Sequence, residues 1–123
     1  MLKRDAAPTA SYSSAPAGGS VDTMTAACVS ELMNAGTSFH KLHLKITGIG
    51  SYAAHKALNE LYDAMPGHAD DLAEGYQGAS EKLLAYSEVA PRTLNTVDDA
   101  LAYIRELTAM VTTLQSKMPY SEL

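Results

Sequence analysis

The sequence is poor in cysteine, in aromatic residues and in basic residues. Cys28 is the single cysteine among 123 residues, which excludes an intrachain disulfide and a cysteine-rich zinc site and fits a reducing compartment. Nine Lys and Arg oppose fourteen Asp and Glu, so the formal net charge is -5. This balance argues against nucleic-acid binding over the whole surface, because phosphate binding depends on clustered Lys and Arg.

Long apolar runs and common catalytic motifs are also absent from the sequence. No run approaches the roughly 18 residues of a membrane span, and the N-terminus lacks the apolar core of a signal peptide. Neither a glycine-rich phosphate loop followed by Lys nor a nucleophile elbow occurs, which argues against a kinase or a hydrolase. We therefore predict a soluble, cytoplasmic protein with no membrane partner.

The chain divides into a polar arm and one domain. Residues 1–20 are mostly Ala, Ser, Pro, Gly and Thr, with almost no large apolar side chains to offset the entropy of ordering. They predict a flexible arm, followed by one helical domain at 21–123. Lys3 and Arg4 are the arm's only cations beyond the terminus, so it is interpreted as a linker or, alternatively, as an arm that holds DNA.

Apolar residues at intervals of three and four predict the first helix. The stripe runs from Val21 to Ile46, and Ser20 is placed to cap it. Gly48 and Gly50 then supply a stop, with Ser51 as the expected N-cap of the next helix.

A second helix is predicted from the stripe that runs from Ala54 to Tyr76. We expect a kink or break at Pro66, because proline lacks a backbone donor and its ring clashes with the preceding turn. Helicity weakens again toward Pro91, although residues 81–88 are compatible with a short helix.

The third stripe runs from Val97 to Met118, after Asn95 or Thr96 as the cap, and Pro119 ends it. No alternating strand pattern of useful length appears, so the predicted class is all-α, with short connections and hence antiparallel neighbours in a bundle. Three such helices make a poorly closed core. A partner subunit, or a terminal segment absent from this chain, would supply the missing wall, and we expect an oligomer.

Two histidines and two carboxylates form the most informative constellation. His43 and His55 lie about equally far on either side of the glycine turn, so an antiparallel hairpin brings them level, as a plausible pair of metal ligands. Asp70 and Glu74 share one helix face, but Asp70 lies about 22 Å beyond His55 along a straight helix. A two-fold partner packed antiparallel would set one chain's acids against the other chain's histidines.

These residues also carry a resemblance. The segment His43-Leu-Lys-Ile-Thr-Gly48, the second histidine His55, and Asp70 followed by Glu74 in Asp-Asp-Leu-Ala-Glu are similar to the Dps branch of the ferritin-like superfamily. The similarity covers about residues 21–83. The phrases His55-Lys-Ala-Leu-Asn-Glu-Leu-Tyr62 and Glu74-Gly-Tyr-Gln-Gly78 resemble still more a small ferritin-like family found in bacteriophage genomes.

The resemblance implies a ferritin-like four-helix bundle assembled into a dodecameric shell, with non-haem iron sites at two-fold interfaces. Fe(II) would be bound by His43 and His55 of one subunit and by Asp70 and Glu74 of its mate, oxidised by peroxide or dioxygen, and stored as a ferric mineral. It also implies a cytoplasmic, nucleoid-associated protein with DNA as a partner. The weakly charged arm does not favour that last expectation.

Several positions depart from the Dps pattern. Asn59 stands where Dps has an acid one turn after its second histidine, so it offers only a neutral carbonyl oxygen as a metal ligand. Leu44 replaces an oxidisable tryptophan and Lys56 replaces an acid. Tyr52 or Tyr62 is an alternative electron donor, although the preferred interpretation of each is a packed core ring. The fourth long helix of the family would begin about where this chain stops.

Two functions of different classes follow from these observations. The first is a Dps-like ferroxidase that stores iron or protects against oxidative stress. The second is a non-enzymatic, phage-encoded structural or virion assembly protein in which the four ligands are relics that hydrogen-bond across an interface. His40 is either a surface or boundary residue or an auxiliary ligand, and His68, beside Pro66, is a lesser candidate for the same role. Cys28 is interpreted as a small buried hydrophobe.

Overall fold

The computed structural model describes residues 20–121 and 123, and the predicted arm lies outside this part of the chain. Three helices form the described structure: α2 (Val21–Lys45), α3 (Ser51–Ser80) and α4 (Val97–Lys117). No strand occurs among these residues, so the all-α class is confirmed. None of the helices in the described part is long and apolar enough to cross a membrane.

The helix ends follow the capping signals of the sequence, with one exception. The Ser20 side chain accepts from the backbone N–H of Thr23, and Thr96 forms a capping box with Asp99. The exception is Ser51, which is the first residue of α3 and not its cap. Gly50 takes the cap position with φ 82°, because the tight turn requires a left-handed backbone that glycine adopts without strain.

We expected a kink or a break at Pro66, and the alternative of a break is wrong, because α3 continues as one helix from Ser51 to Ser80. Proline removes one backbone hydrogen bond, but α3 is long and packed along its length against α2. A Cβ built on Gly36 of α2 would lie 3.6 Å from Cδ of Pro66 and 3.7 Å from the carbonyl oxygen of Tyr62. The close approach of α2 at this turn supports the helix where its own hydrogen bonding is weakest.

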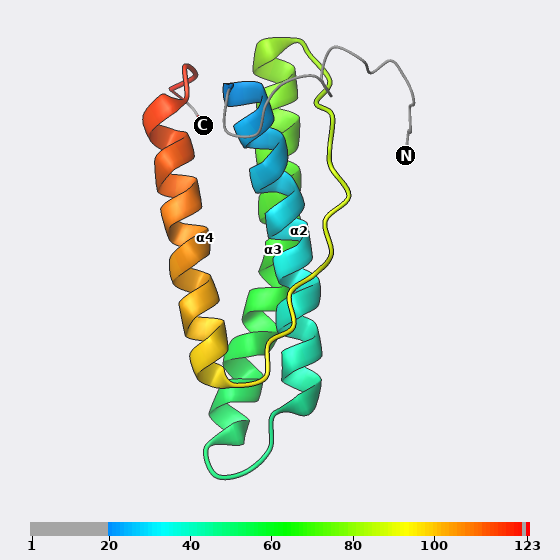
Figure 1. Cartoon of the computed structure of the whole chain (residues 1–123), viewed down its shortest axis with the longest axis vertical. Coiled ribbons are helices and arrows are strands. Elements are labelled where there is room, and N and C mark those ends of the chain that lie inside the picture. The colour runs from blue at the N-terminus through cyan, green and yellow to red at the C-terminus, as the bar shows by residue number, and fades with distance from the viewer. Residues whose placement is uncertain (1–19, 122) are drawn as a thin grey trace.

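The short helix expected at 81–88 is also absent, since the chain has no regular structure from 82 to 95. This segment, the crossover, instead runs along the whole length of α2 (Figure 1). Side chains of α2 bind its backbone: Asn34 Nδ2 donates to the carbonyl of Val89 at 2.7 Å, and the N–H of Arg92 donates to Ser38 Oγ at 2.9 Å. Within 81–88, the N–H of Leu84 donates to Gln77 Oε1 at 3.0 Å, and a backbone group held by a side chain is not available to a helix.

The crossover changes the topology that the sequence predicted. Because it returns the chain to the end of the bundle where α2 stops, α4 runs antiparallel to α2 but parallel to α3 (Figure 1). The expectation of short connections throughout, with every neighbour antiparallel, is therefore wrong for α3 and α4. The short turn between α2 and α3 does follow the expectation.

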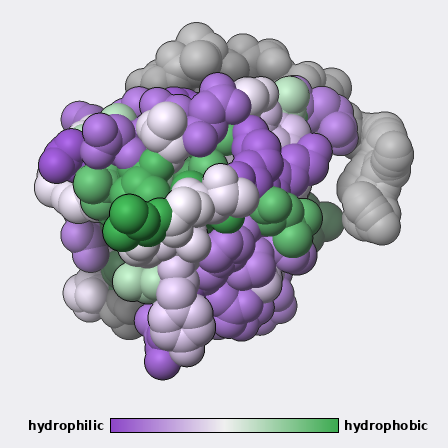
Figure 2. Space-filling model, turned by 90° about the horizontal axis from the view of Figure 1, so that it is seen from below, coloured by the Kyte–Doolittle hydropathy of each residue, from purple (hydrophilic) through white to green (hydrophobic). Residues whose placement is uncertain are grey.

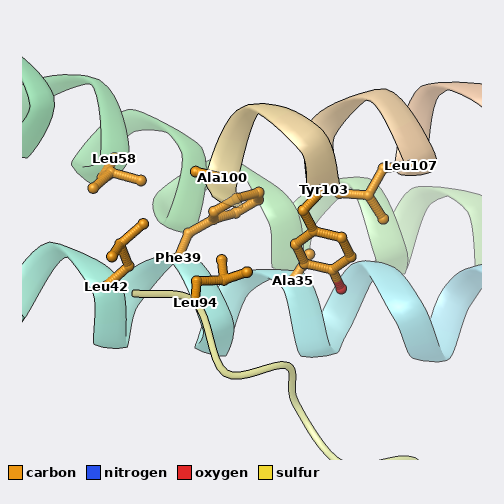
Figure 3. Close-up of a cluster of buried hydrophobic side chains, with 8 residues drawn as sticks. All are labelled: Ala35, Phe39, Leu42, Leu58, Leu94, Ala100, Tyr103 and Leu107. Carbon is orange, nitrogen blue, oxygen red and sulfur yellow. The ribbon is translucent and has the colours of Figure 1, made fainter. Parts of the chain in front are cut away.

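The core lies where the three helices and the crossover meet. Phe39 and Tyr103 are buried with ring centroids 5.5 Å apart, and Leu94 of the crossover packs beside them (Figure 3). Arg92 covers the Tyr103 ring at 4.5 Å from its centroid and pairs with Glu106 at 2.6 Å. The Tyr103 hydroxyl donates to Glu31. These contacts fasten α4 and the crossover to α2.

Candidate functional site

The α2–α3 turn brings His43 and His55 together. The two imidazole rings lie edge to face, with centroids 4.7 Å apart and an interplanar angle of 86°. His43 is on the last turns of α2, His55 is on the first turns of α3, and both are partly buried. The proximity expected from their equal spacing about the turn is therefore present in the structure.

The hydrogen bonds of His43 and His55 indicate which ring nitrogens are available to bind a ligand. His55 Nε2 lies 2.8 Å from the carbonyl oxygen of Ile46, which can only accept, so Nε2 carries a proton and neutral His55 keeps its lone pair on Nδ1. His43 Nδ1 is buried and has no hydrogen-bond partner among the described residues. Buried polar atoms are rarely left unsatisfied. A nitrogen in this position fits an added ligand, such as a metal ion.

Two further aromatic side chains extend the histidine pair. The Tyr62 ring stacks on His40 at a centroid distance of 3.9 Å and an angle of 8°, and meets the edge of His43 at 5.3 Å. Tyr62 is partly buried, as a packed ring should be, whereas Tyr52 is 79% exposed and does not fill the core. The sequence identified His40 and Tyr62 separately. The spacing of residues within either helix did not predict that these two rings would stack across the helices.

Asn59, the neutral residue of the predicted ligand set, is already hydrogen-bonded. Its Oδ1 accepts from the Tyr62 hydroxyl at 2.6 Å, and its Nδ2 donates to Asp63 at 3.4 Å. Oδ1 is the only atom of an asparagine side chain that ligates a hard metal well. A metal would share this oxygen with the tyrosine or displace the hydroxyl.

The two carboxylates stand apart from the histidines. Asp70 and Glu74 are exposed on the second half of α3, where neither takes part in the hydrogen bonds or ion pairs of the described residues. Because α3 is continuous, Asp70 lies about 22 Å along the axis from His55, although only about 60° around it. No cluster of three potential ligands in the described part is arranged to hold a metal. The histidine pair and the two carboxylates therefore lie far apart within one copy of the chain.

The remaining candidate residues are His68 and Cys28. His68 is exposed on α3, far along the helix from His55. Cys28 is fully buried, and burial, with a further contribution from the charge of Glu31, raises the pKa of its thiol to about 11. It is the small buried hydrophobe that the sequence predicted, and its thiolate is scarce at neutral pH.

Comparison with known proteins gives a family but no characterised relative. Neither the curated proteins nor the solved structures contain a significant match to this chain. Residues 43–123 match a family of unknown function, DUF5856, and this segment includes His43, all of α3, the crossover and α4. Because the match covers more than half of the sequence, the chain belongs to the family DUF5856.

Proposed function

We propose that two copies of this chain bind Fe(II) at sites shared across a two-fold interface and oxidise it, as the resemblance to Dps implies. The observation that carries the proposal is the His43–His55 pair, with a buried nitrogen that lacks a hydrogen-bond partner. Imidazole and carboxylate together are a common ligand set for iron. Fe(II) is the substrate, and the ferric product would be stored or released.

The outer face of α2 and α3 offers a surface for the two-fold contact. Met33, His40 and Leu44 follow one stripe of α2, and Tyr52, Asn59 and Asp70 follow one stripe of α3, at the spacing of a helix face. The His40–Tyr62 stack joins the two stripes. Met33, Leu44 and Tyr52 are large apolar side chains with 48%, 72% and 79% exposure. Exposed apolar side chains grouped in this way are typical of an interface.

The distribution of ligands on this face favours an antiparallel arrangement. The histidines lie at the end of the face beside the α2–α3 turn, and Asp70 and Glu74 lie about 22 Å away along α3. A two-fold axis between these ends places the carboxylates of one copy opposite the imidazoles of the other, twice per dimer. A site shared between two copies requires that each chain hold only part of the ligand set at each end of the face, as this chain does.

The topology gives independent support to the resemblance. A single long crossover between the second and third helices is a feature of ferritin-like folds, and the crossover here has that place in the chain.

The oxidation of Fe(II) by peroxide needs no further chemical group. Two Fe(II) ions each give one electron to one peroxide, which takes up two protons and leaves as two water molecules.

An anaerobic Fe(II) titration followed by addition of peroxide tests the proposal. We expect saturation near two irons per dimer and rapid oxidation, with the oligomer mass recorded on the same sample. His43→Ala and Glu74→Ala should each abolish both, whereas the exposed His68→Ala serves as the matched control and should change neither. Wild-type rates in both ligand variants would overturn the proposal.

A second candidate is an assembly protein, of phage origin if the closer resemblance holds, whose metal site has degenerated. The hydrogen bond that Asn59 Oδ1 accepts from Tyr62 favours it, because the oxygen is already engaged. This candidate predicts a defined oligomer whose melting temperature does not respond to Fe(II). A rise of several degrees with iron, absent in His43→Ala, would exclude it.

A further inference from the structure

A groove between α3 and α4 is lined without a single charged side chain. The two helices run parallel and both rest on α2, which leaves a cavity of about 390 Å³ between them. Leu32 and Phe39 of α2 form its floor, and Leu61 and Met65 of α3 form one wall. Apart from the groove, apolar side chains also reach the surface at the end of the bundle beside the α2–α3 turn, between polar ones (Figure 2).

The α4 wall of the groove is uncharged along most of the helix. Ile104, Thr108, Val111, Thr112 and Gln115 line it, and three of them are exposed. Leu101, one turn earlier on the same side, is 44% exposed. A solvated helix face normally carries charged residues, so an uncharged face beside an apolar groove indicates a surface that is covered by another segment.

Two side chains of opposite charge flank this groove. Arg105 lies about 20° around α4 from Thr112, and Asp71 lies about 80° around α3 from Leu61. Both are exposed, and neither takes part in the ion pairs of the described residues, which join Lys82 to Asp22 and Arg92 to Glu31 and Glu106.

Arg105 and Asp71 of one chain lie at different heights in the bundle. Ala69 packs in one cluster with Leu114, which sets Asp71 near the level of Leu114. Because Leu114 is nine residues beyond Arg105 on α4, the two charges are offset by about 13 Å along the bundle. Arg105 and Asp71 therefore do not pair within one copy.

We propose that a second copy of this chain docks in the groove, with its α4 antiparallel to the first. The lining stretch of α4 runs from Ile104 to Gln115, so a two-fold axis at its middle brings Arg105 of one copy level with Leu114 of the other. This is the level of Asp71. Each copy then pairs its Arg105 with Asp71 of the other, and the uncharged faces of both α4 helices bury one another.

This contact is separate from the α2–α3 face on which the proposed iron site depends. It involves no metal ligand, and it persists whether or not the protein binds iron. Two different self-contacts on one chain build an assembly larger than a dimer, since each copy then touches two others.

Charge reversal in the full chain tests the pairing by sedimentation equilibrium without metal. Asp71→Arg and Arg105→Asp should each weaken the association at the groove by about tenfold, because each places like charges opposite one another. The double variant should restore it, since the pair is then re-formed with exchanged signs. Glu88→Arg, an exposed acid on the crossover, is the matched control and should leave the mass unchanged.

The outcomes separate this contact from the proposed iron site. The same pattern is expected in a His43→Ala background, so loss of iron binding leaves the groove result standing. Thr108→Arg, which puts a charge inside the groove, should abolish the contact while the circular dichroism spectrum stays helical. Unchanged mass in all three single groove variants, or a double variant as weak as the single ones, would overturn the proposal.

Discussion

Gly36 of α2 faces Pro66 of α3 across the contact between the two helices. A Cβ added at Gly36 would lie 3.4 Å from Cβ of Met65 and 3.6 Å from Cδ of Pro66, which is ordinary van der Waals contact. Pro66 donates no backbone hydrogen bond, so the carbonyl of Tyr62 has no helical donor there. The contact explains how α3 passes through a proline without breaking.

Gly36→Ala should stabilise the protein by about 0.5–1 kcal/mol, because the methyl group fits the contact and alanine favours the helix. Gly36→Leu should instead cost about 1–3 kcal/mol, since the larger side chain collides with α3 at Met65 and Pro66. Gly67, which has open space around it, is the matched control. Both substitutions at Gly67 should stabilise, as measured by denaturant unfolding. Equal effects of leucine at the two glycines would contradict the close packing.

Ser38→Ala should destabilise the protein by about 1–3 kcal/mol, because the N–H of Arg92 loses its hydrogen-bond acceptor in the partly buried crossover contact. The Ser38 hydroxyl also donates to the carbonyl of Asn34 at 2.8 Å. Ser30→Ala is the control, since its hydroxyl reaches the crossover only at 3.5 Å and is exposed. Thermal unfolding of the two variants should differ clearly, and equal melting temperatures would show that the crossover is not held by Ser38.

Asp22 should contribute stability that disappears in acid. Burial of the carboxylate opposes its ionisation, but hydrogen bonds from Lys82 and Tyr76 outweigh this and lower the pKa of Asp22 below 3.8. A carboxyl group with a lowered pKa stabilises the fold above its pKa in the unfolded chain, and that stabilisation is lost as pH falls through the folded-state value. Unfolding free energies measured from pH 7 to pH 2 should therefore fall less steeply in Asp22→Asn. If the unfolding free energies of Asp22→Asn and the wild type fall in parallel with pH, the acid sensitivity comes from other groups.

Asn59→Asp should tighten Fe(II) binding by about tenfold if the proposed site operates, because a carboxylate binds a hard cation more strongly than an amide oxygen. Anaerobic titration measures the change directly. Asn95→Asp makes the same change of charge on the exposed loop before α4 and should not alter the affinity. Weaker binding in Asn59→Asp than in the wild type would indicate that Fe(II) binding requires the Asn59 amide in its hydrogen bond with the Tyr62 hydroxyl.

Local signals in the sequence located the helices well. Ser20 and Thr96 cap α2 and α4 because their side chains satisfy free backbone donors, and this depends only on neighbouring residues. The apolar stripes gave the buried faces, and Phe39 and Leu42 are indeed fully buried. The meeting of His43 and His55 was also predictable, since a short turn fixes which positions of a hairpin are level.

Contacts between distant residues decided the rest. Pro66 stays inside a helix because Gly36 lets α2 pack against that turn. Residues 82–95 form no helix, because side chains of α2 and α3 hold the backbone at Leu84, Val89 and Arg92. No local pattern encodes either result. The sequence by itself therefore determined where α2 and α4 begin and which helix faces are buried, since those preferences act within one or two turns. Only the tertiary structure decided that α4 runs parallel to α3 and that Tyr62 stacks on His40, because these depend on energies shared between segments far apart in the chain.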